Sequence, residues 1–306
     1  EKNRINYKSK NKGVMHACGH DSHITIGLGI AKVLALNKEK LNGNIKFIFQ
    51  PAEEKLSGAA KMISDGIFEN HQIDSIIGFH NWPELPLGEI GLKKGAIMAA
   101  VDKFSIQING KGGHGSEPHK TKDTVILANN FISRIQTLIS REINPLDSAV
   151  ISIGQIRGGN AFNIIPDSIK LKGTVRSFDN KVRDKIDKKM EEILKEVTLS
   201  SKSSFNLNYQ RLIPATINND DFTDFVYNVL NYYQELPEVK YLENPSMVGE
   251  DFSLFLDEIP GTYFFLGASE KNNVKKLHDP YYNVSDKILI PGVKSITQIA
   301  FNYLNK

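Results

Sequence analysis

The sequence predicts an α/β domain whose sheet contains parallel strands, interrupted by an inserted α+β domain. In the first hundred residues, short apolar runs alternate with segments of helical periodicity, the pattern of βαβ units. From about residue 99, strands with alternating apolar and polar residues dominate. After these alternating strands, the chain returns to a helix and a buried strand of the first type. We therefore expect a discontinuous first domain, residues 1–98 and 213–306, around an inserted domain of residues 99–212.

The first domain begins with a helix and continues with alternating strands and helices. Residues 22–36 have helical spacing, 45–49 form an apolar strand, 58–68 are helical, and 75–79 form a second strand. Proline and a turn at Asn81-Trp82-Pro83 end the second strand. Polar motifs follow both strands, so we expect mixed or parallel strands, helices on both faces and a site beyond the carboxyl ends of the strands.

The inserted domain combines amphipathic helices with alternating strands on a largely antiparallel sheet. The expected strands include residues 104–108, 149–155 and 169–175, and the expected helices are 123–141 and 180–197. After residue 213 we expect a helix at 222–233, a strand at 262–266 and a closing helix at 291–303. These last elements return the chain to the first domain.

Composition is that of an ordinary folded protein. The 306 residues are 40% hydrophobic and 24% charged, enough for two domains with cores, and the net charge of +3 does not indicate nucleic-acid binding. No apolar run approaches a membrane span, and the single cysteine cannot form an internal disulfide, so we expect a reducing, cytoplasmic setting. The chain lacks an initiator Met and opens just before its best motif, which suggests a fragment.

Soft and hard metal ligands occur together near the N-terminus. Cys18 and His20 are two positions apart and can face one ion, and a thiolate, an imidazole and a carboxylate suit a borderline ion such as zinc. The alternative is a buried thiol beside a hydrogen-bonded histidine. We expect His16 and His23 to lie at the surface or beside the ligands without binding the ion.

Glu53 and Glu54 follow the first expected strand. Neighbouring residues of a strand point in opposite directions, so one glutamate can bind metal while the other faces a water molecule. The alternative is an exposed Glu-Glu pair of no special function, which is common.

Two further histidines follow strands. His80 ends an apolar strand, where metal coordination would supply the partner that a buried imidazole needs. His278 follows a strand and a polar loop, and Asp279 can orient it. A capping histidine and a surface-loop histidine are the respective alternatives.

Three residues of the inserted domain are candidates for substrate contact. His114 lies among glycines that allow close approach of a ligand, although simple turn chemistry explains them equally well. Asn163 and Arg176 can bind a carboxylate, for which arginine has a matching planar group. Most exposed strand arginines are merely solvated.

Eight motifs follow one another along the chain. They are His-Ala-Cys-Gly-His-Asp, Pro-Ala-Glu-Glu, Gly-Phe-His-Asn-Trp-Pro, Gly-Gly-His-Gly-Ser-Glu-Pro-His, Asn-Ile-Ile-Pro-Asp, Gly-Thr-Val-Arg-Ser-Phe, Gly-Glu-Asp-Phe and Leu-His-Asp-Pro. In this order they closely resemble the peptidase M20 amidohydrolases, in the branch of hippurate hydrolase, auxin-conjugate hydrolases and N-acetyldiaminopimelate deacetylase. The resemblance covers nearly the whole chain, but we expect that the N-terminal segment that such proteins carry before this point is missing.

The resemblance implies a metallopeptidase-type catalytic domain with two divalent ions, zinc, manganese, nickel or cobalt, and an inserted lid that also forms a homodimer. It implies metal ligation by Cys18, His20, Glu54, His80 and His278. It also implies that Glu53 is the general base, that His114, from the lid or from a partner subunit, stabilises the oxyanion, and that Asn163 and Arg176 hold the substrate.

From these features we expect a metal-dependent amidohydrolase that cleaves the amide bond of small N-acyl amino acids. One alternative is a dipeptidase or aminopeptidase on the same scaffold, which would require a free α-amino group on its substrate. The other is a non-catalytic relative that dimerises or binds small acids through the lid. No nucleic-acid or membrane partner is expected.

Overall fold

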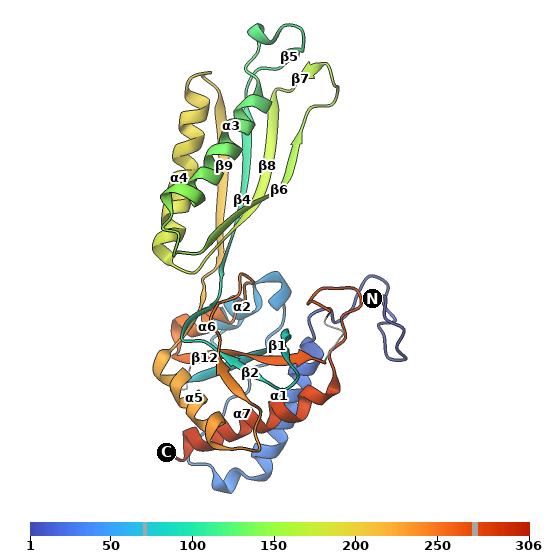
Figure 1. Cartoon of the computed structure of the whole chain (residues 1–306), viewed down its shortest axis with the longest axis vertical. Helices are drawn as coiled ribbons and strands as arrows, with labels where there is room; N and C mark the ends of the chain where they lie inside the picture. The colour runs from blue at the N-terminus through green and yellow to red at the C-terminus, as the bar shows by residue number, and fades with distance from the viewer. Residues whose placement is uncertain (70–71, 271–274) are drawn as a thin grey trace. The chain divides into compact units, whose positions relative to one another are not determined.

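The computed structural model describes residues 1–69, 72–270 and 275–306, and its chain forms two compact units (Figure 1). The first unit comprises Glu1–Ile97, Ile217–Pro245 and Leu254–Lys306, and the second comprises Met98–Thr216 and Ser246–Ser253. The fold is mixed α/β, as the sequence predicts. No helix in the described ranges is both long and apolar enough to cross a membrane.

The first unit is built on a four-stranded mixed sheet of order β1-β12-β2-β11. The outer pairs β1-β12 and β2-β11 are parallel, while β12 and β2 are antiparallel. The strands are β1 (Ile76–Pro86), β2 (Ile90–Leu92), β11 (Val239–Tyr241) and β12 (Gly261–Ser269). A separate pair, β3 (Gly95–Met98) and β10 (Thr216–Asn218), lies where the chain passes between units.

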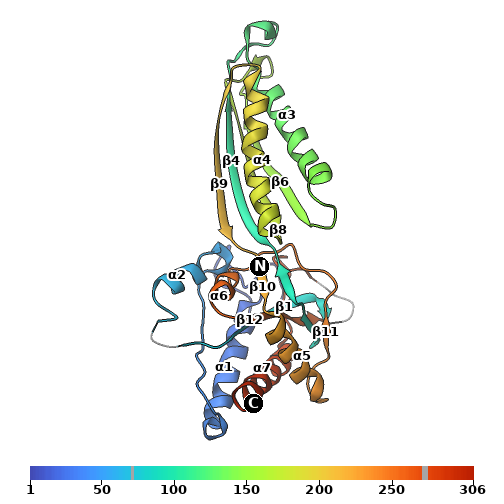
Figure 2. The ribbon, with the colours of Figure 1, turned by 90° about the vertical axis from the view of Figure 1, so that its left-hand side faces the viewer.

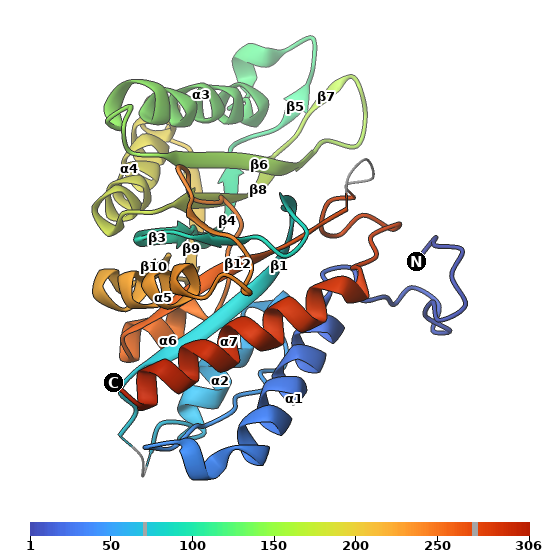
Figure 3. The ribbon, with the colours of Figure 1, turned by 60° about the horizontal axis from the view of Figure 1, so that its bottom comes forward.

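Helices cover both faces of this sheet. α1, α5 and α7 lie on one face and share one apolar core with it, and Figures 1 and 2 show α2 and α6 on the other face. α1 and α7 pack side by side (Figure 3). The helices are α1 (His20–Leu36), α2 (Gly58–Ser64), α5 (Asp220–Tyr232), α6 (Ser253–Glu258) and α7 (Leu289–Leu304), with short turns η1 (Lys38–Lys40), η2 (Glu53–Lys55) and η5 (Asp286–Ile288).

Periodicity explains which side of each element is buried. Ile26, Ile30 and Leu34 recur every four residues on α1 and face the core. On β12, Phe264 and Leu266 point to the same core because alternate residues of a strand share a face. The residue between them, Phe265, points to the opposite face and stacks on Trp82.

Two sequence expectations for this unit are wrong. Residues 45–49 are not a strand, since no described strand pairs with them, and Phe47 and Phe49 remain exposed. An apolar run becomes a strand only when a neighbour supplies hydrogen bonds, which periodicity cannot reveal. The turn expected at Asn81-Trp82-Pro83 is instead part of β1, because Asn81 and Trp82 continue the pairing with β12. β1 is an edge strand, where proline is tolerated.

The second unit has an antiparallel sheet of order β6-β8-β4-β9 with two helices packed on one face. The strands are β4 (Ala100–Asn109), β6 (Ala149–Gly158), β8 (Ser168–Ser177) and β9 (Ser204–Ile213). The helices are α3 (Thr124–Thr137), which continues into the π turn η4 (Leu138–Glu142), and α4 (Asn180–Leu199). A smaller pair, β5 (Gly113–His114) and β7 (Ile164–Ile165), and the turn η3 (Pro118–Lys120) complete it.

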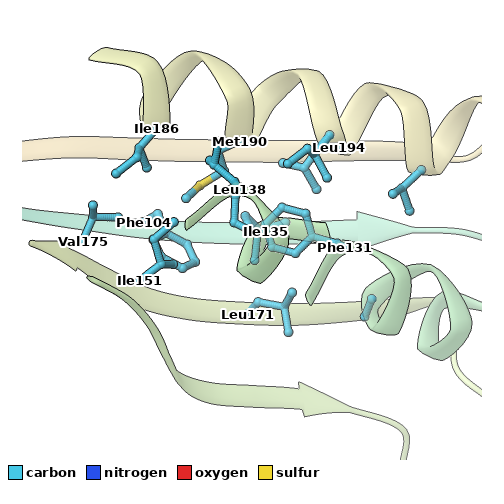
Figure 4. Packing of buried hydrophobic residues seen from close by; sticks show 14 of the residues in the cluster. Phe104, Phe131, Ile135, Leu138, Ile151, Leu171, Val175, Ile186, Met190 and Leu194 are labelled. Atoms are coloured by element: carbon cyan, nitrogen blue, oxygen red, sulfur yellow. The ribbon is translucent and has the colours of Figure 1, made fainter. Parts of the chain in front are cut away.

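This unit has its own apolar core. Phe104 from β4, Phe131 from α3 and Met190 from α4 are fully buried and meet between the sheet and the helices (Figure 4). The carboxylates of Asp123 and Asp179 accept backbone hydrogen bonds at the starts of α3 and α4.

One buried ion pair joins three elements of the second unit. The Arg183 guanidinium on α4 donates from Nε to both carboxylate oxygens of Asp102 on β4, at 2.9 and 3.1 Å, and from Nη2 to the Ile213 carbonyl of β9 at 3.0 Å. The Tyr209 hydroxyl donates to the same carboxylate at 2.7 Å. Burial and this bond raise the pKa of Tyr209, which stays protonated. Both oxygens of the buried Asp102 carboxylate thus accept hydrogen bonds, as a buried charge requires.

Candidate metal centre

The first potential ligands lie where α1 begins. Cys18 is buried and His20 is the first residue of the helix, with Gly19 between them in a left-handed conformation, φ 78°. A Cβ at Gly19 would lie only 2.6 Å from Nδ2 of Asn81. Only glycine fits both the conformation and the space, so the sequence Cys-Gly-His sets the directions of the two ligand side chains.

His80 reaches this place from β1. Its Nε2 atom lies 3.4 Å from Cys18 Sγ, and its Nδ1 atom lies 2.6 Å from the carbonyl oxygen of Asn81. A carbonyl only accepts, so Nδ1 carries the proton and Nε2 presents a lone pair toward the thiol. Burial lowers the pKa of His80 to about 4, which keeps the imidazole neutral at neutral pH. A neutral imidazole is the form that binds a metal.

Glu53 and Glu54 lie in the short turn η2, not on a strand as the sequence analysis assumed. The turn is flanked by Ala52 and Leu56, both left-handed with φ 57° and 51°. Glu53 Oε2 lies 3.5 Å from His20 Nε2, whereas Glu54 Oε2 lies 3.3 Å from His278 Nε2. The two carboxylates therefore contact different imidazoles, as expected. A tight turn separates their directions, and not the alternation of side chains along a strand.

His278 comes from the loop after β12. Its backbone is also left-handed, φ 66°, and its N–H donates to the Ala17 carbonyl at 2.8 Å. Non-glycine residues in this conformation are uncommon and carry a cost that the surrounding structure must offset. Ala52, Leu56 and His278 all border the same group of side chains, which is where strained backbone is expected at a functional site.

These donor atoms form overlapping groups. Within each group, all ligand atoms lie within 4.8 Å of one another, and the groups share members: Cys18, His20 and His80; Cys18, Glu54 and His278; His20, Glu53 and Glu54. Ligands bound to one zinc ion at about 2.0–2.3 Å lie at most about 4.6 Å apart. The donor set of thiol, imidazole and carboxylate, in contiguous groups, therefore fits divalent ions of the zinc type.

The solvent exposure of the potential ligands increases from the interior of the centre to its surface. Cys18 and His80 are only 7% and 4% exposed, whereas the His278 and Glu54 side chains are 62% and 50% exposed. Burial also lowers the pKa of His20, with Glu54 opposing that shift. One end of the centre is thus shielded and the other is open to a substrate.

The other three candidate residues lie in the second unit. His114 is exposed on β5, where its Nδ1 lies 2.7 Å from the Ser116 hydroxyl, and the Asn163 carbonyl accepts a hydrogen bond from Gly115 at 2.8 Å. Arg176 lies at the end of β8 opposite Ser168 and donates to the Thr174 hydroxyl at 2.6 Å. Desolvation lowers the pKa of Arg176. The structure thus brings His114 and Asn163 together but not Arg176, which is about 26 Å along the strand from Ser168.

Asn81, which lies beside the buried ligands, is not indicated by the sequence. Asn81 is fully buried and hydrogen-bonds to the Cys18 carbonyl, to His23 and to Tyr282. His23, expected at the surface or beside the ligands, has its ring 4.7 Å from that of His80, while His16 is exposed. The position of Asn81 directly after His80 was the available signal, but it was interpreted as a turn.

Comparison with known proteins identifies the family of this chain. The model of Peptidase family M20/M25/M40 matches residues 1–302. The chain belongs to this family. It is 40% identical over 302 residues to the putative amidohydrolase YhaA of Bacillus subtilis, covering 98% of this chain and 76% of that protein. It is also 40% identical over 298 residues to the hippurate hydrolase of Campylobacter jejuni, covering 97% and 76%.

Solved structures of the family share the fold. A putative aminohydrolase from methicillin-resistant Staphylococcus aureus superposes with a TM-score of 0.92 at 31% identity, over 99% of this chain and 78% of that one. The Bacillus subtilis YXEP protein, described as a dinuclear metal binding peptidase from M20 family, gives 0.85 at 30% identity, over 100% and 78%. This M20-family chain is a hydrolase of amide bonds.

Proposed function

We propose that this chain is a two-metal amidohydrolase that cleaves N-acyl amino acids into a carboxylic acid and a free amino acid. The observation that carries the proposal is the convergence of one thiol, three imidazoles and two carboxylates in overlapping groups. A hippurate hydrolase and an N-acetyl-L-cysteine deacetylase of Bacillus subtilis, 38% identical over 291 residues, are among its relatives. Both names denote hydrolysis of an N-acyl amino acid.

In this proposal the ions are divalent, of the zinc, manganese, nickel or cobalt type, and are held by Cys18, His20, Glu54, His80 and His278. The dinuclear neighbour supports the number of ions. Bound there, such ions would act as Lewis acids that polarise the amide carbonyl and lower the pKa of a water molecule. The neutral state of His80 and the buried thiol beside it are suited to this binding.

Glu53 is the proposed general base. Its carboxylate lies 3.5 Å from His20 Nε2 and belongs to the same donor group as Glu54. From that position it would accept a proton from the attacking water and return it to the amine as the C–N bond breaks. This transfer leaves the carboxylate as it began, so the residue turns over with the reaction.

His114, Asn163 and Arg176 are the proposed substrate-contacting residues, with His114 stabilising the oxyanion. Within one copy of the second unit, Asn163 directly precedes β7, on the side of the Ser168 end of β8, whereas Arg176 lies at the opposite end of β8, much farther away than the length of an N-acyl amino acid. One copy cannot bring both to one small substrate. We therefore propose a homodimer in which a second copy supplies one of these ends.

The experiment that tests the function is an assay of the metal-loaded protein on N-acetyl, N-benzoyl and indole-acyl amino acids, with dipeptides in parallel. Metal-dependent release of the amino acid from an N-acyl substrate is the expected result. Cleavage that occurs only when the substrate has a free α-amino group would replace the proposal with a dipeptidase or aminopeptidase activity. Binding of small acids without turnover would favour a non-catalytic relative.

A peptidase is the second candidate because of one similarity. The thermostable carboxypeptidase 1 of Saccharolobus solfataricus is 37% identical over 311 residues, covering 100% of this chain and 78% of that protein. A carboxypeptidase also acts on an amide bond whose amine belongs to an amino acid. Dipeptides with free and with acylated N-termini separate the two activities.

A further inference from the structure

Asn81 occupies the interior of the candidate metal centre without being one of its potential ligands. Its side chain is fully buried, and its Nδ2 donates to the Cys18 carbonyl at 2.7 Å and lies 2.7 Å from His23 Nε2. The Tyr282 hydroxyl donates to Asn81 Oδ1. Since the Cys18 carbonyl can only accept, the side-chain amide has one possible orientation. In this orientation Nδ2 points to the Cys18 carbonyl and to His23, and Oδ1 points to the Tyr282 hydroxyl.

These contacts also define the protonation of the two neighbouring histidines. The Asn81 backbone N–H donates to His23 Nε2 at 3.0 Å, so that nitrogen is an acceptor and His23 carries its proton on Nδ1. The Asn81 carbonyl accepts from His80 Nδ1 at 2.6 Å. His80 is therefore also protonated on Nδ1, which leaves its Nε2 lone pair directed toward Cys18 Sγ.

Asn81 joins three chain segments that are far apart in the sequence. Cys18 lies in the segment before α1, His80 within β1, and His278 in the loop that continues to Tyr282. The Tyr282 N–H donates to Asp279, so the hydroxyl that binds Asn81 belongs to the same loop as His278. One side chain thus fixes the spacing between three of the candidate ligands.

We propose that Asn81, held by Tyr282 and His23, is a positioning residue that sets the tautomer of His80 and the place of Cys18 before metal binds. This inference rests on the proposed metalloenzyme function. Groups that orient metal ligands typically change metal affinity by about 10–100-fold when they are lost. Asn81 acts through Cys18 and His80 and contacts no substrate.

The test compares Tyr282→Phe with Tyr281→Phe in metal-free protein titrated with Co²⁺ alone. Tyr282→Phe removes only the hydroxyl that holds Asn81, whereas Tyr281 is its exposed neighbour on the same loop. The dissociation constant for Co²⁺ should rise by about 10-fold or more in Tyr282→Phe and stay unchanged in Tyr281→Phe. Cobalt absorption should also change, because the thiolate and imidazole donors would be less well oriented.

A merely structural role for Tyr282 predicts a different result. In that case the unfolding temperature of the metal-free variant falls while its Co²⁺ dissociation constant equals that of the unsubstituted protein, which would overturn the inference. Absence of Co²⁺ binding by the unsubstituted protein would instead overturn the proposed function.

A second measurement needs neither a variant nor bound metal. Long-range ¹⁵N–¹H correlation spectra of the metal-free protein distinguish the two neutral tautomers of each histidine. The inference requires protons on Nδ1 of both His80 and His23. Protonation of His80 at Nε2 would show that Asn81 does not set its tautomer and would refute the inference even if Tyr282→Phe does not fold.

Discussion

At the scale of single residues, the adjacent glutamates illustrate how a short turn can give two similar side chains different partners. Glu53 faces His20 and Glu54 faces His278, and the left-handed residues on either side of the turn produce this divergence. A carboxylate at one position can thus exchange protons while its neighbour binds metal.

Glu53→Gln keeps the shape of the side chain but removes the proton acceptor. We expect turnover to fall by about 10² or more with metal content retained. Glu54→Gln should instead lower metal content, since a neutral amide is a poorer ligand than a carboxylate. Metal analysis and turnover are measured on both variants. Loss of metal from Glu53→Gln alone would reverse the two assignments.

The buried pair between Arg183 and Asp102 predicts a large effect on stability. Asp102→Asn leaves the buried guanidinium without its counter-charge and should lower the free energy of unfolding by about 3–5 kcal/mol. The exposed pair of Arg134 and Glu196 is the control, and Glu196→Gln should cost less than about 1 kcal/mol. Urea unfolding measures both. Equal losses would mean that burial of the first pair has no energetic consequence.

At the scale of elements, the helices of the second unit depend on side chains that cap their first turns. Asp179 accepts hydrogen bonds from the N–H groups of Lys181 and Val182, at 2.7 and 3.0 Å. These groups have no carbonyl partner within the helix, so the carboxylate satisfies them and also interacts favourably with the helix dipole.

Asp179→Ala should therefore destabilise the second unit by about 1 kcal/mol, the usual cost of removing an N-terminal cap. Asp147, in the loop before β6, serves as a matched control, and Asp147→Ala should have a smaller effect. Chemical unfolding followed by far-ultraviolet circular dichroism measures both. A loss of stability in Asp147→Ala as large as that in Asp179→Ala would argue against capping as the cause.

At the scale of the whole molecule, each unit has its own apolar core. The five proposed metal ligands, Cys18, His20, Glu54, His80 and His278, belong to the first unit. Metal binding should therefore stabilise one unit selectively. A ligand that binds only the folded state adds about 2.7 kcal/mol when its free concentration is 100 times its dissociation constant.

Chelation of the metal should increase amide hydrogen exchange in α1, β1 and β12 and lower the unfolding temperature of the first unit. Exchange in β4, β8 and α4 should change little. Exchange measured by mass spectrometry with and without a chelator tests this. Equal deprotection of both units would show that they unfold as one cooperative body.

The sequence by itself determined the chemistry of the centre and the types of most elements. Cys18, His20 and His80 are residue types that bind metals, and the motifs around them are sufficient to identify the family. Helices such as α1, α5 and α4 follow from local periodicity, because the same side chains that define the pattern pack the core.

Only the tertiary structure decided which atoms meet. The apolar run at 45–49 predicts a strand, but pairing depends on a neighbour far along the chain, and the described residues contain none. Asn81 looks like a turn residue in the sequence, yet β12 keeps it in β1 and Tyr282 and Cys18 surround it. Hydrogen bonds between distant segments leave no local pattern, and these bonds arrange the ligands that the sequence could only name.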